Sequence, residues 1–148
     1  MPQQALRISE ALGRFNHLHS ELDSLYHKAA HRLGVSDSAM HILYTVYSEG
    51  DRCPLSTICR LSLISKQTIN SALRKLEREG MVYLEGYYGR RKLVCLTEEG
   101  MALAERTAAV VIGIENRILG KWSENERTEY FRLMQSYISA FRDETAKL

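Results

Sequence analysis

Between residues 65 and 78, polar side chains follow one another in a pattern that suits contact with the edges of nucleic-acid bases. The segment reads SKQTINSALRKLER. The amides of Gln67 and Asn70 can each form two hydrogen bonds with adenine, and the cations of Lys66 and Arg74 can do the same with guanine. Hydroxyl groups in the segment can bind either bases or phosphate. The residues of this segment that we expect to contact DNA are Ser65, Lys66, Gln67, Thr68, Asn70, Ser71 and Arg74.

Three consecutive cations, Arg90, Arg91 and Lys92, form a second group that we expect to bind DNA. Neighbouring positive charges repel one another unless an anion lies between them, and the negative potential of a narrow minor groove attracts arginine. A hairpin kept soluble by charges on its edge is the alternative explanation, and it accounts for Lys92 better than for all three residues.

The cations of segment 65–78 have an ordinary explanation too, because charged residues on a helix usually do no more than interact with solvent. The first two turns of the segment contain no acidic residue, whereas Glu77 and Glu79 stand near its end. Residues 60–92 as a whole contain eight lysines or arginines and three acids, while the complete chain has a net charge of only +2. This concentration of positive charge favours a face that meets a polyanion.

Composition describes an ordinary globular chain of 148 residues, with 45% hydrophobic and 26% charged residues. No apolar run is long enough to span a membrane, and the N-terminus lacks the pattern of a secretory signal, which predicts a cytoplasmic protein. Its three cysteines lack C-x-x-C spacing, so we expect reduced thiols, no metal and no cofactor. Glycine-rich phosphate loops, nucleophile elbows and paired catalytic carboxylates are also missing, which argues against an enzyme.

Hydrophobic spacing predicts a mostly α-helical fold. A long helix is expected over residues 5–33, stopped by Gly34, and a second over 37–48, capped by Ser36. A short third helix, capped by Ser56 and burying Leu61 or Leu63, precedes a fourth helix capped by Ser65. The fourth helix buries a stripe that contains Ile69, Ala72, Leu73 and Leu76.

A β-hairpin is expected after the fourth helix, with strands over 81–85 and 92–96 and a tip over 86–89. Thr97 caps a further helix that runs to about Leu119, and Ser123 and Glu126 form a capping box for the last helix. The helices, the short turn and the hairpin together predict a winged helix-turn-helix.

Both ends of the chain read as amphipathic helices that need a partner along their apolar stripes. We therefore predict an N-terminal dimerisation helix over 1–35, a DNA-binding winged helix-turn-helix domain over 36–97, and C-terminal dimerisation helices over 98–148. A two-fold symmetric homodimer fits this arrangement.

The motif S-x-x-T-I-x-x-x-L-x-x-L-E-x-x-G, followed by R-R-K-x-x-x-L-T-x-x-G, resembles the MarR family of bacterial winged-helix transcription regulators. The resemblance implies a homodimer that binds double-stranded DNA at a pseudo-palindromic operator and represses transcription. In many members small phenolic or lipophilic ligands release the DNA, and in some thiol oxidation does. Arg90 matches the DNA-contacting arginine of the family's wing, but Tyr88 stands where an aspartate is usual, and Leu63 stands where a turn glycine is usual.

Residues that could sense a signal are less distinctive. Aromatic and histidine side chains of the first two helices are candidates for an effector pocket by position alone, although such stripes more often form ordinary core. These candidates are Phe15, His19, Tyr26, His41 and Tyr44.

Other functions of the same fold stay open. His27 and His31 are one turn apart and could share a metal, although exposed histidines are the commoner explanation. Cys59 is expected on the buried side of its helix, and Cys53, in a loop, is the thiol expected to be most accessible. The alternatives are thus a thiol- or metal-responsive regulator, or a winged helix that binds another protein.

Overall fold

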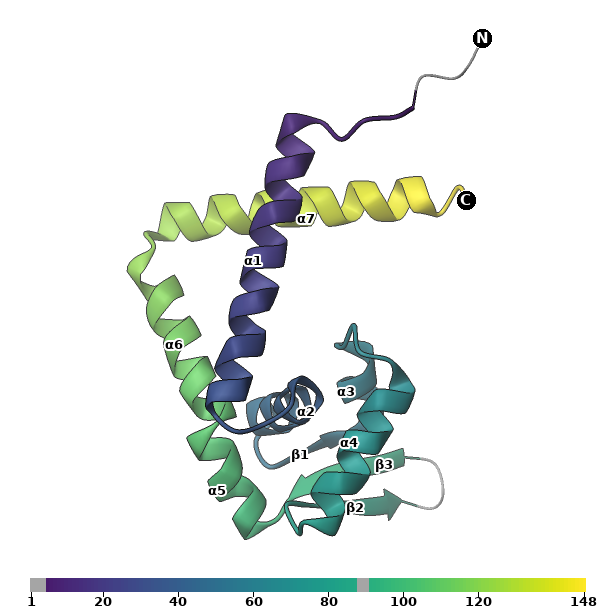
Figure 1. Ribbon diagram of the computed structural model, residues 1–148, viewed down its shortest axis with the longest axis vertical. Coiled ribbons are helices and arrows are strands. Elements are labelled where there is room, and N and C mark those ends of the chain that lie inside the picture. Colours follow the sequence, from purple (N-terminus) through teal and green to yellow (C-terminus); the bar gives the residue numbers. More distant parts are fainter. Residues whose placement is uncertain (1–4, 88–90) are drawn as a thin grey trace. The chain divides into compact units, whose positions relative to one another are not determined.

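The computed structural model describes residues 5–87 and 91–148, with the backbone alone at Tyr87 and Arg91 (Figure 1). The described chain is mostly helical with one small antiparallel sheet, as the sequence predicted. It divides into two compact units, Met1–Val110 and Val111–Leu148. No helix in the described part of the chain is long and apolar enough to cross a membrane.

Helix α1 covers Glu10–Arg32 and so begins five residues later than predicted. The side chain of Ser9 accepts a hydrogen bond from the amide of Leu12 at 3.0 Å, which fixes the start of the helix. The predicted stop at Gly34 is confirmed, because this residue has a φ of +83°, a conformation that glycine adopts without strain.

Helix α2, Asp37–Ser48, begins at the predicted cap Ser36, whose hydroxyl accepts from the amide of Ala39 at 3.1 Å. A three-residue strand that the sequence did not predict, β1 (Arg52–Pro54), follows it. Helix α3 is then short, Leu55–Arg60, and leads into helix α4, Lys66–Arg78.

Two predictions about the α3 region are wrong. Ser56 does not cap α3, because the cap position falls on Pro54 and Ser56 lies within the first turn. Leu61 and Leu63 do not pack inside: they are 62% and 105% exposed. The turn instead buries part of Ile64, and the hydroxyl of Ser62 accepts from the amide of Ile64 at 2.9 Å.

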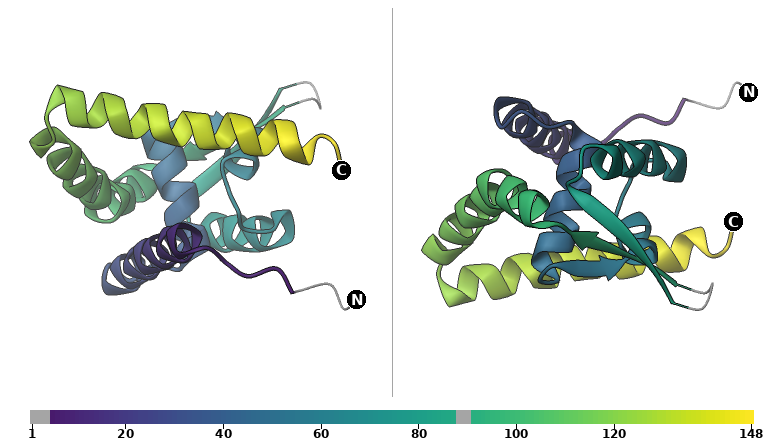
Figure 2. Two further views of the ribbon diagram at one scale, coloured as in Figure 1. Left: turned by 90° about the horizontal axis from the view of Figure 1, so that it is seen from above. Right: turned by 90° about the horizontal axis from the view of Figure 1, so that it is seen from below.

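The predicted hairpin is confirmed as strands β2 (Val82–Tyr87) and β3 (Arg91–Leu96), which lie side by side in both views of Figure 2. Strand β2 continues through Gly86 and the backbone of Tyr87, where the sequence predicted the tip; residues 88 and 89 lie outside the described part. All pairs are antiparallel, and β3 is central in the order β1-β3-β2.

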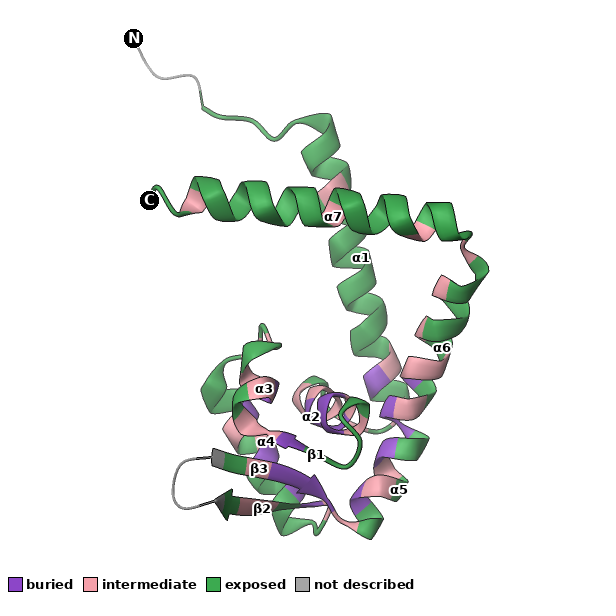
Figure 3. Cartoon of the chain, turned by 180° about the vertical axis from the view of Figure 1, so that it is seen from behind, coloured by how far each residue is buried: buried purple, intermediate pink, exposed green. Residues whose placement is uncertain are grey.

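The core of the first unit lies between the sheet and helices α2 to α5, where buried residues gather in Figure 3. The predicted stripe of α4 is confirmed: Ile69, Leu73 and Leu76 are at most 4% exposed, and Ala72 packs against them. Complete burial of one large aliphatic side chain contributes roughly 1.5–3 kcal/mol, so this stripe fixes which face of α4 is left for solvent. Other core members are Ile42, Leu43, Val46, Ile58, Val82 and Val94.

The helix predicted from Thr97 to about Leu119 is two helices, α5 (Glu98–Arg106) and α6 (Ala108–Lys121). The chain breaks at Thr107, which has φ −127° and ψ −83° and whose hydroxyl donates to the carbonyl of Leu103 at 2.7 Å. Ile118, in the last turns of α6, is 52% exposed.

The second unit contains α7, Glu124–Thr145. The predicted capping box is present: Ser123 Oγ accepts from the Glu126 amide, and the Glu126 carboxylate accepts from the Ser123 amide. None of the residues of α7 is buried in the single chain, as Figure 3 shows.

Candidate nucleic-acid interface

Helix α4 presents the predicted contact residues on the face opposite its buried stripe. Lys66, Gln67, Ser71 and Arg74 are exposed, and Asn70 is half-buried beside them. A helix that buries three large aliphatic residues cannot rotate about its axis without exposing them, so the orientation of these polar groups is set by the core.

The two hydroxyl groups at the start of α4 serve the helix itself. Ser65 Oγ accepts from the amide of Thr68 at 3.1 Å and lies 2.7 Å from Thr68 Oγ1. Ser71 Oγ donates to the carbonyl of Gln67 at 3.1 Å. The groups on this face that are not engaged in such contacts are therefore the longer amide and cationic side chains.

A groove of about 320 Å³ separates α4 from the hairpin, and it brings together residues from both predicted groups. Lys66, Asn70 and Arg74 reach it from α4, and Lys92 reaches it from β3. Its remaining lining is one carboxylate and three leucines: Glu77, Leu55, Leu73 and Leu84.

Sequence reasoning missed Glu77 as a member of this surface. The spacing could have revealed it, because Glu77 lies three residues after Arg74 and seven after Asn70 and therefore shares their face of the helix. Carboxylates accept hydrogen bonds from the amino group of cytosine, so this position can favour one base over another.

The charge of the groove is predominantly positive. Within the described residues, Lys66, Arg74 and Lys92 form no ion pair, whereas Lys75, outside the groove, lies 4.0 Å from Glu79. A second hollow of about 370 Å³ follows α4 and is lined by Lys66, Gln67, Asn70, Ser71 and Arg74. Arg90 and the side chain of Arg91 lie outside the described part, so their predicted role stays a prediction.

The prediction that Cys53 is the most accessible thiol is wrong. Cys53 lies in β1, pairs with Val94 of β3 and is 2% exposed. Burial raises its pKa to about 11, and the nearby carboxylate of Glu49 adds to this. Cys59, expected to be buried, is only half-buried.

The histidines predicted as possible metal ligands have other environments. His27 Nδ1 lies 2.8 Å from a carboxylate oxygen of Asp37, so this side chain links α1 to α2. In the part of the chain that the structure describes, no three histidine, cysteine or acidic residues come together in a way that could hold a metal ion.

Three of the candidates for an effector pocket make contacts that can be described in detail. His41 Nε2 lies 2.7 Å from the carbonyl oxygen of Ile58, and the rings of Phe15 and His19 are 4.4 Å apart. These contacts fit ordinary packing between and along helices.

Comparison with known proteins relates part of the chain to a known family. The model of the MarR family matches residues 33–91, which include α2, the helix-turn-helix and strand β2. This segment of the chain is similar to the MarR family. MarR proteins are transcriptional regulators and not enzymes, in agreement with the sequence prediction.

Similar proteins extend the comparison beyond the matched segment. The chain is 32% identical over 80 residues to the HTH-type transcriptional repressor Rv2887 of Mycobacterium tuberculosis. That match spans 53% of this chain and 58% of the repressor.

Solved structures share the fold over almost the whole length. NMB1585, a MarR family regulator from Neisseria meningitidis, superposes with a TM-score of 0.80 at 16% identity, covering 94% of this chain and 99% of that one. MepR from Staphylococcus aureus, solved as a DNA complex, superposes with a TM-score of 0.67 at 20% identity, covering 91% and 99%. These likenesses confirm the fold, including the terminal helices.

Proposed function

We propose that this chain is a MarR-family, sequence-specific DNA-binding transcription regulator that acts as a homodimer on a pseudo-palindromic operator. It represses transcription, and a small aromatic or lipophilic effector releases it from the DNA. The observation that carries the proposal is the groove in which Lys66, Asn70 and Arg74 of α4 meet Lys92 of β3.

The chemistry of this surface suits a duplex. Amide and cationic side chains on one helix face can pair with base edges in a major groove, while Lys92 can neutralise phosphate. The buried stripe of α4 holds these groups outward, and the sheet holds Lys92 on the far side of the groove. We expect Gln67 and Arg74 to contribute most to sequence selectivity.

Exposed apolar side chains on the terminal helices support a dimer. Only Ala30 of α1 is buried, and α7 has no buried residue. A single helix of this length that is amphipathic and uncovered gains stability by packing against a partner. The large apolar residues of α7 that are at least 43% exposed are Tyr130, Phe131, Leu133, Tyr137, Ile138 and Phe141.

Relatives support repression and DNA binding. The mycobacterial relative is named a transcriptional repressor, and MepR was solved bound to DNA. Effector release is inferred from family membership, in which small phenolic or lipophilic ligands are common.

A winged helix that binds another protein is the competing function. It requires apolar groups on the exposed face of α4, where this chain has Lys66, Gln67, Asn70 and Arg74. This composition favours DNA.

Binding to DNA can be tested with the purified chain and a mixed-sequence duplex at several salt concentrations. A DNA-binding surface predicts retention on heparin and an affinity that falls steeply as salt rises, because bound cations displace counterions from the duplex. A protein-binding module predicts neither, and absence of both would refute the proposal.

A further inference from the structure

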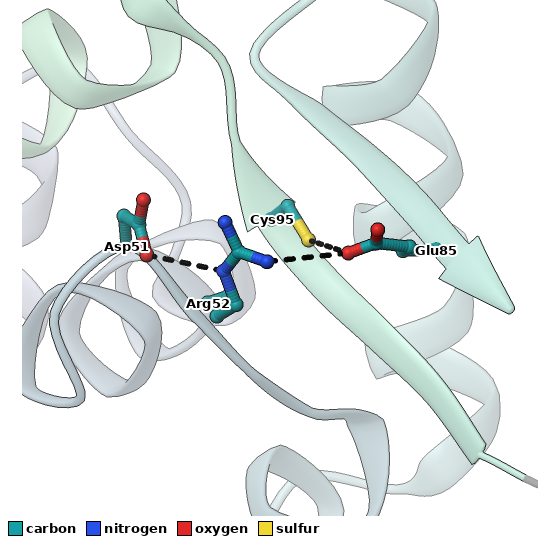
Figure 4. Close-up of polar contacts among 4 residues, drawn as sticks. All are labelled: Asp51, Arg52, Glu85 and Cys95. Atoms are coloured by element: carbon teal, nitrogen blue, oxygen red, sulfur yellow. Dashed lines mark hydrogen bonds and ion pairs between the residues drawn. The ribbon is translucent and has the colours of Figure 1, made fainter. Parts of the chain in front are cut away.

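A chain of polar contacts crosses the outer face of the sheet (Figure 4). The guanidinium group of Arg52, on β1, donates from Nε to Asp51 Oδ1 at 3.3 Å and from Nη1 to Glu85 Oε2 at 3.4 Å. Glu85 belongs to β2, and the strand order is β1-β3-β2. The Arg52–Glu85 bridge therefore passes over the central strand and joins the two outer strands, which share no backbone hydrogen bonds.

Cys95 of β3 lies beneath this bridge. Its Cα pairs with those of Arg52 and Tyr83, and its thiol donates to the same Glu85 oxygen at 3.7 Å. Side chains alternate along a strand, so Cys95 points away from the core that holds Val94. Even so, it is 1% exposed, which means that neighbouring side chains on the outer face cover it.

The bridge ends next to the part of the hairpin that reaches the DNA-binding groove. Glu85 pairs with Leu93, and the next pair is Gly86 with Lys92. Gly86 has no side chain, and a Cβ placed on it would meet nothing within 4 Å. Gly86 is the strand partner of Lys92. Glu85, the residue before Gly86, is therefore the last side chain of β2 that a described contact holds in place.

We propose that the Arg52–Glu85 bridge positions Lys92 for DNA binding, by holding the hairpin against β1 so that Lys92 stays across the groove from Lys66 and Arg74. The inference rests on the proposed function. Arg52 and Glu85 are positioning residues: they lie on the outer face of the sheet, whereas the groove lies on the side of α4.

The sign of the expected effect separates this role from simple electrostatics. Glu85 carries a negative charge near a surface that binds a polyanion, so removing that charge should strengthen binding if charge alone matters. Loss of a contact that positions Lys92 should instead weaken the binding of DNA. Both side chains are about half exposed, and contacts of this kind are worth little, so we expect a change of about two- to fivefold.

Two variants of Glu85 test the inference by fluorescence anisotropy on one duplex. Glu85→Gln removes the charge, and Glu85→Asp keeps the charge but shortens the reach to Arg52. Both are expected to lower affinity about two- to fivefold, with melting temperatures close to that of the wild type. Glu79→Gln is the matched control, because Glu79 pairs with Lys75 outside the groove, and its removal should leave affinity unchanged or slightly higher.

A second background tests whether the effect passes through Lys92. In the Lys92→Met variant, Glu85→Asp should change affinity by less than in the wild type; an undiminished effect overturns the inference. It is also overturned if Glu85→Asp binds like the wild type while Glu85→Gln binds more tightly. Failure of the wild-type chain to bind any duplex would instead refute the proposed function, so the two failures are distinguishable.

Discussion

A methyl group placed on Gly100 would lie 1.7 Å from the carbonyl oxygen of Met81. Gly100 is in the first turn of α5, and Met81 lies in the turn between α4 and β2, so this close approach joins the start of α5 to the turn that follows α4. Thr97 adds to the joint, because its hydroxyl donates to the carbonyl of Gly80 at 2.6 Å and accepts from the amide of Gly100 at 3.0 Å. This joint fixes the position of α4 relative to the sheet.

Replacement of Gly100 by alanine should destabilise the fold by about 3 kcal/mol or more, because backbone and not a movable side chain blocks the new methyl group. Urea denaturation measures the effect. Gly120→Ala in α6 is the matched control: nothing lies within 4 Å of its position, and it should stabilise by about 0.5–1 kcal/mol. Equal stabilities of the two variants would contradict this description of the joint.

Thr97→Val removes the hydroxyl but keeps the shape of the side chain. We expect a loss of about 1–2 kcal/mol, because the helix cap and the bond to Gly80 disappear together. Thr97→Ser retains the hydroxyl and should lose clearly less. A valine variant as stable as the serine variant in thermal denaturation would show that the hydroxyl is unimportant.

Local signals allowed much of this fold to be predicted from sequence. The caps at Ser36, Ser65 and Ser123 are predicted correctly because the hydroxyl of a cap residue accepts a hydrogen bond from a backbone amide only two or three residues further along the chain. The α4 stripe was correct because three aliphatic residues at helical spacing specify one face. The polar residues of α4 that line the groove could be predicted because they lie on the face opposite this stripe.

Features that depend on distant contacts could not be predicted. Strand β1 exists because Arg52–Pro54 pairs with β3, about forty residues away, and a three-residue segment has no periodicity of its own. The sequence alone therefore predicts a loop at Cys53. The break at Thr107 contains neither glycine nor proline, and the bridge from Arg52 to Glu85 depends on the sheet order.

On α4, Gln67→Ala and Arg74→Ala should weaken binding to the cognate operator by about 10- to 100-fold while changing non-specific binding much less. Each loses up to two hydrogen bonds to a base edge. Gel-shift titrations with operator and scrambled duplexes measure the ratio of the specific to the non-specific affinity. Lys75→Ala is the control, since Lys75 lies outside both hollows along α4, and it should leave that ratio unchanged.

Cations of the hairpin should behave differently. Lys92→Ala should lower the affinity for all DNA sequences, and so should Arg90→Ala and Arg91→Ala. Each variant should also reduce the slope of log affinity against log salt concentration by the amount expected for about one phosphate contact. Sequence-selective losses for Lys92→Ala would instead assign that residue to a base.

The thiols should be poor sensors of oxidation. The thiolate is the reactive form, and burial raises the pKa of both Cys53 and Cys95. In a timed reaction with a thiol reagent at pH 7.5, we expect at most Cys59 to react quickly and the other two to react only after unfolding. Rapid labelling of a Cys59→Ser variant in its folded state would contradict this.

Alkaline pH should destabilise the protein through Cys53. Its pKa is about 11 in the fold against an ordinary value of 9.0, so the unfolded chain loses this proton first as pH rises. The stability contributed by the protonated thiol is complete below about pH 9 and decreases from there to pH 11. Cys53→Ala should show a shallower fall in urea denaturation across that range, and an identical fall would contradict the pKa.

Dimerisation should depend on the apolar residues of α7. Phe141 is 61% exposed and stacks on Tyr137 with ring centroids 6.1 Å apart. Phe141→Glu should shift the chain to a monomer in sedimentation velocity and weaken operator binding, whereas Phe141→Leu should remain a dimer. A wild-type chain that sediments as a monomer at micromolar concentration would remove the basis of the dimer.

The central claim is that the surface formed by α4 and Lys92 binds duplex DNA with two copies of the chain on each site. The most direct measurement is a fluorescence anisotropy titration of duplexes from the chain's own genome, with stoichiometry and affinity followed from 50 to 200 mM salt. We predict two chains per specific duplex and an affinity that falls by roughly a thousandfold or more over this range. Binding of one chain per duplex, or no binding at the lowest salt concentration, would contradict the claim.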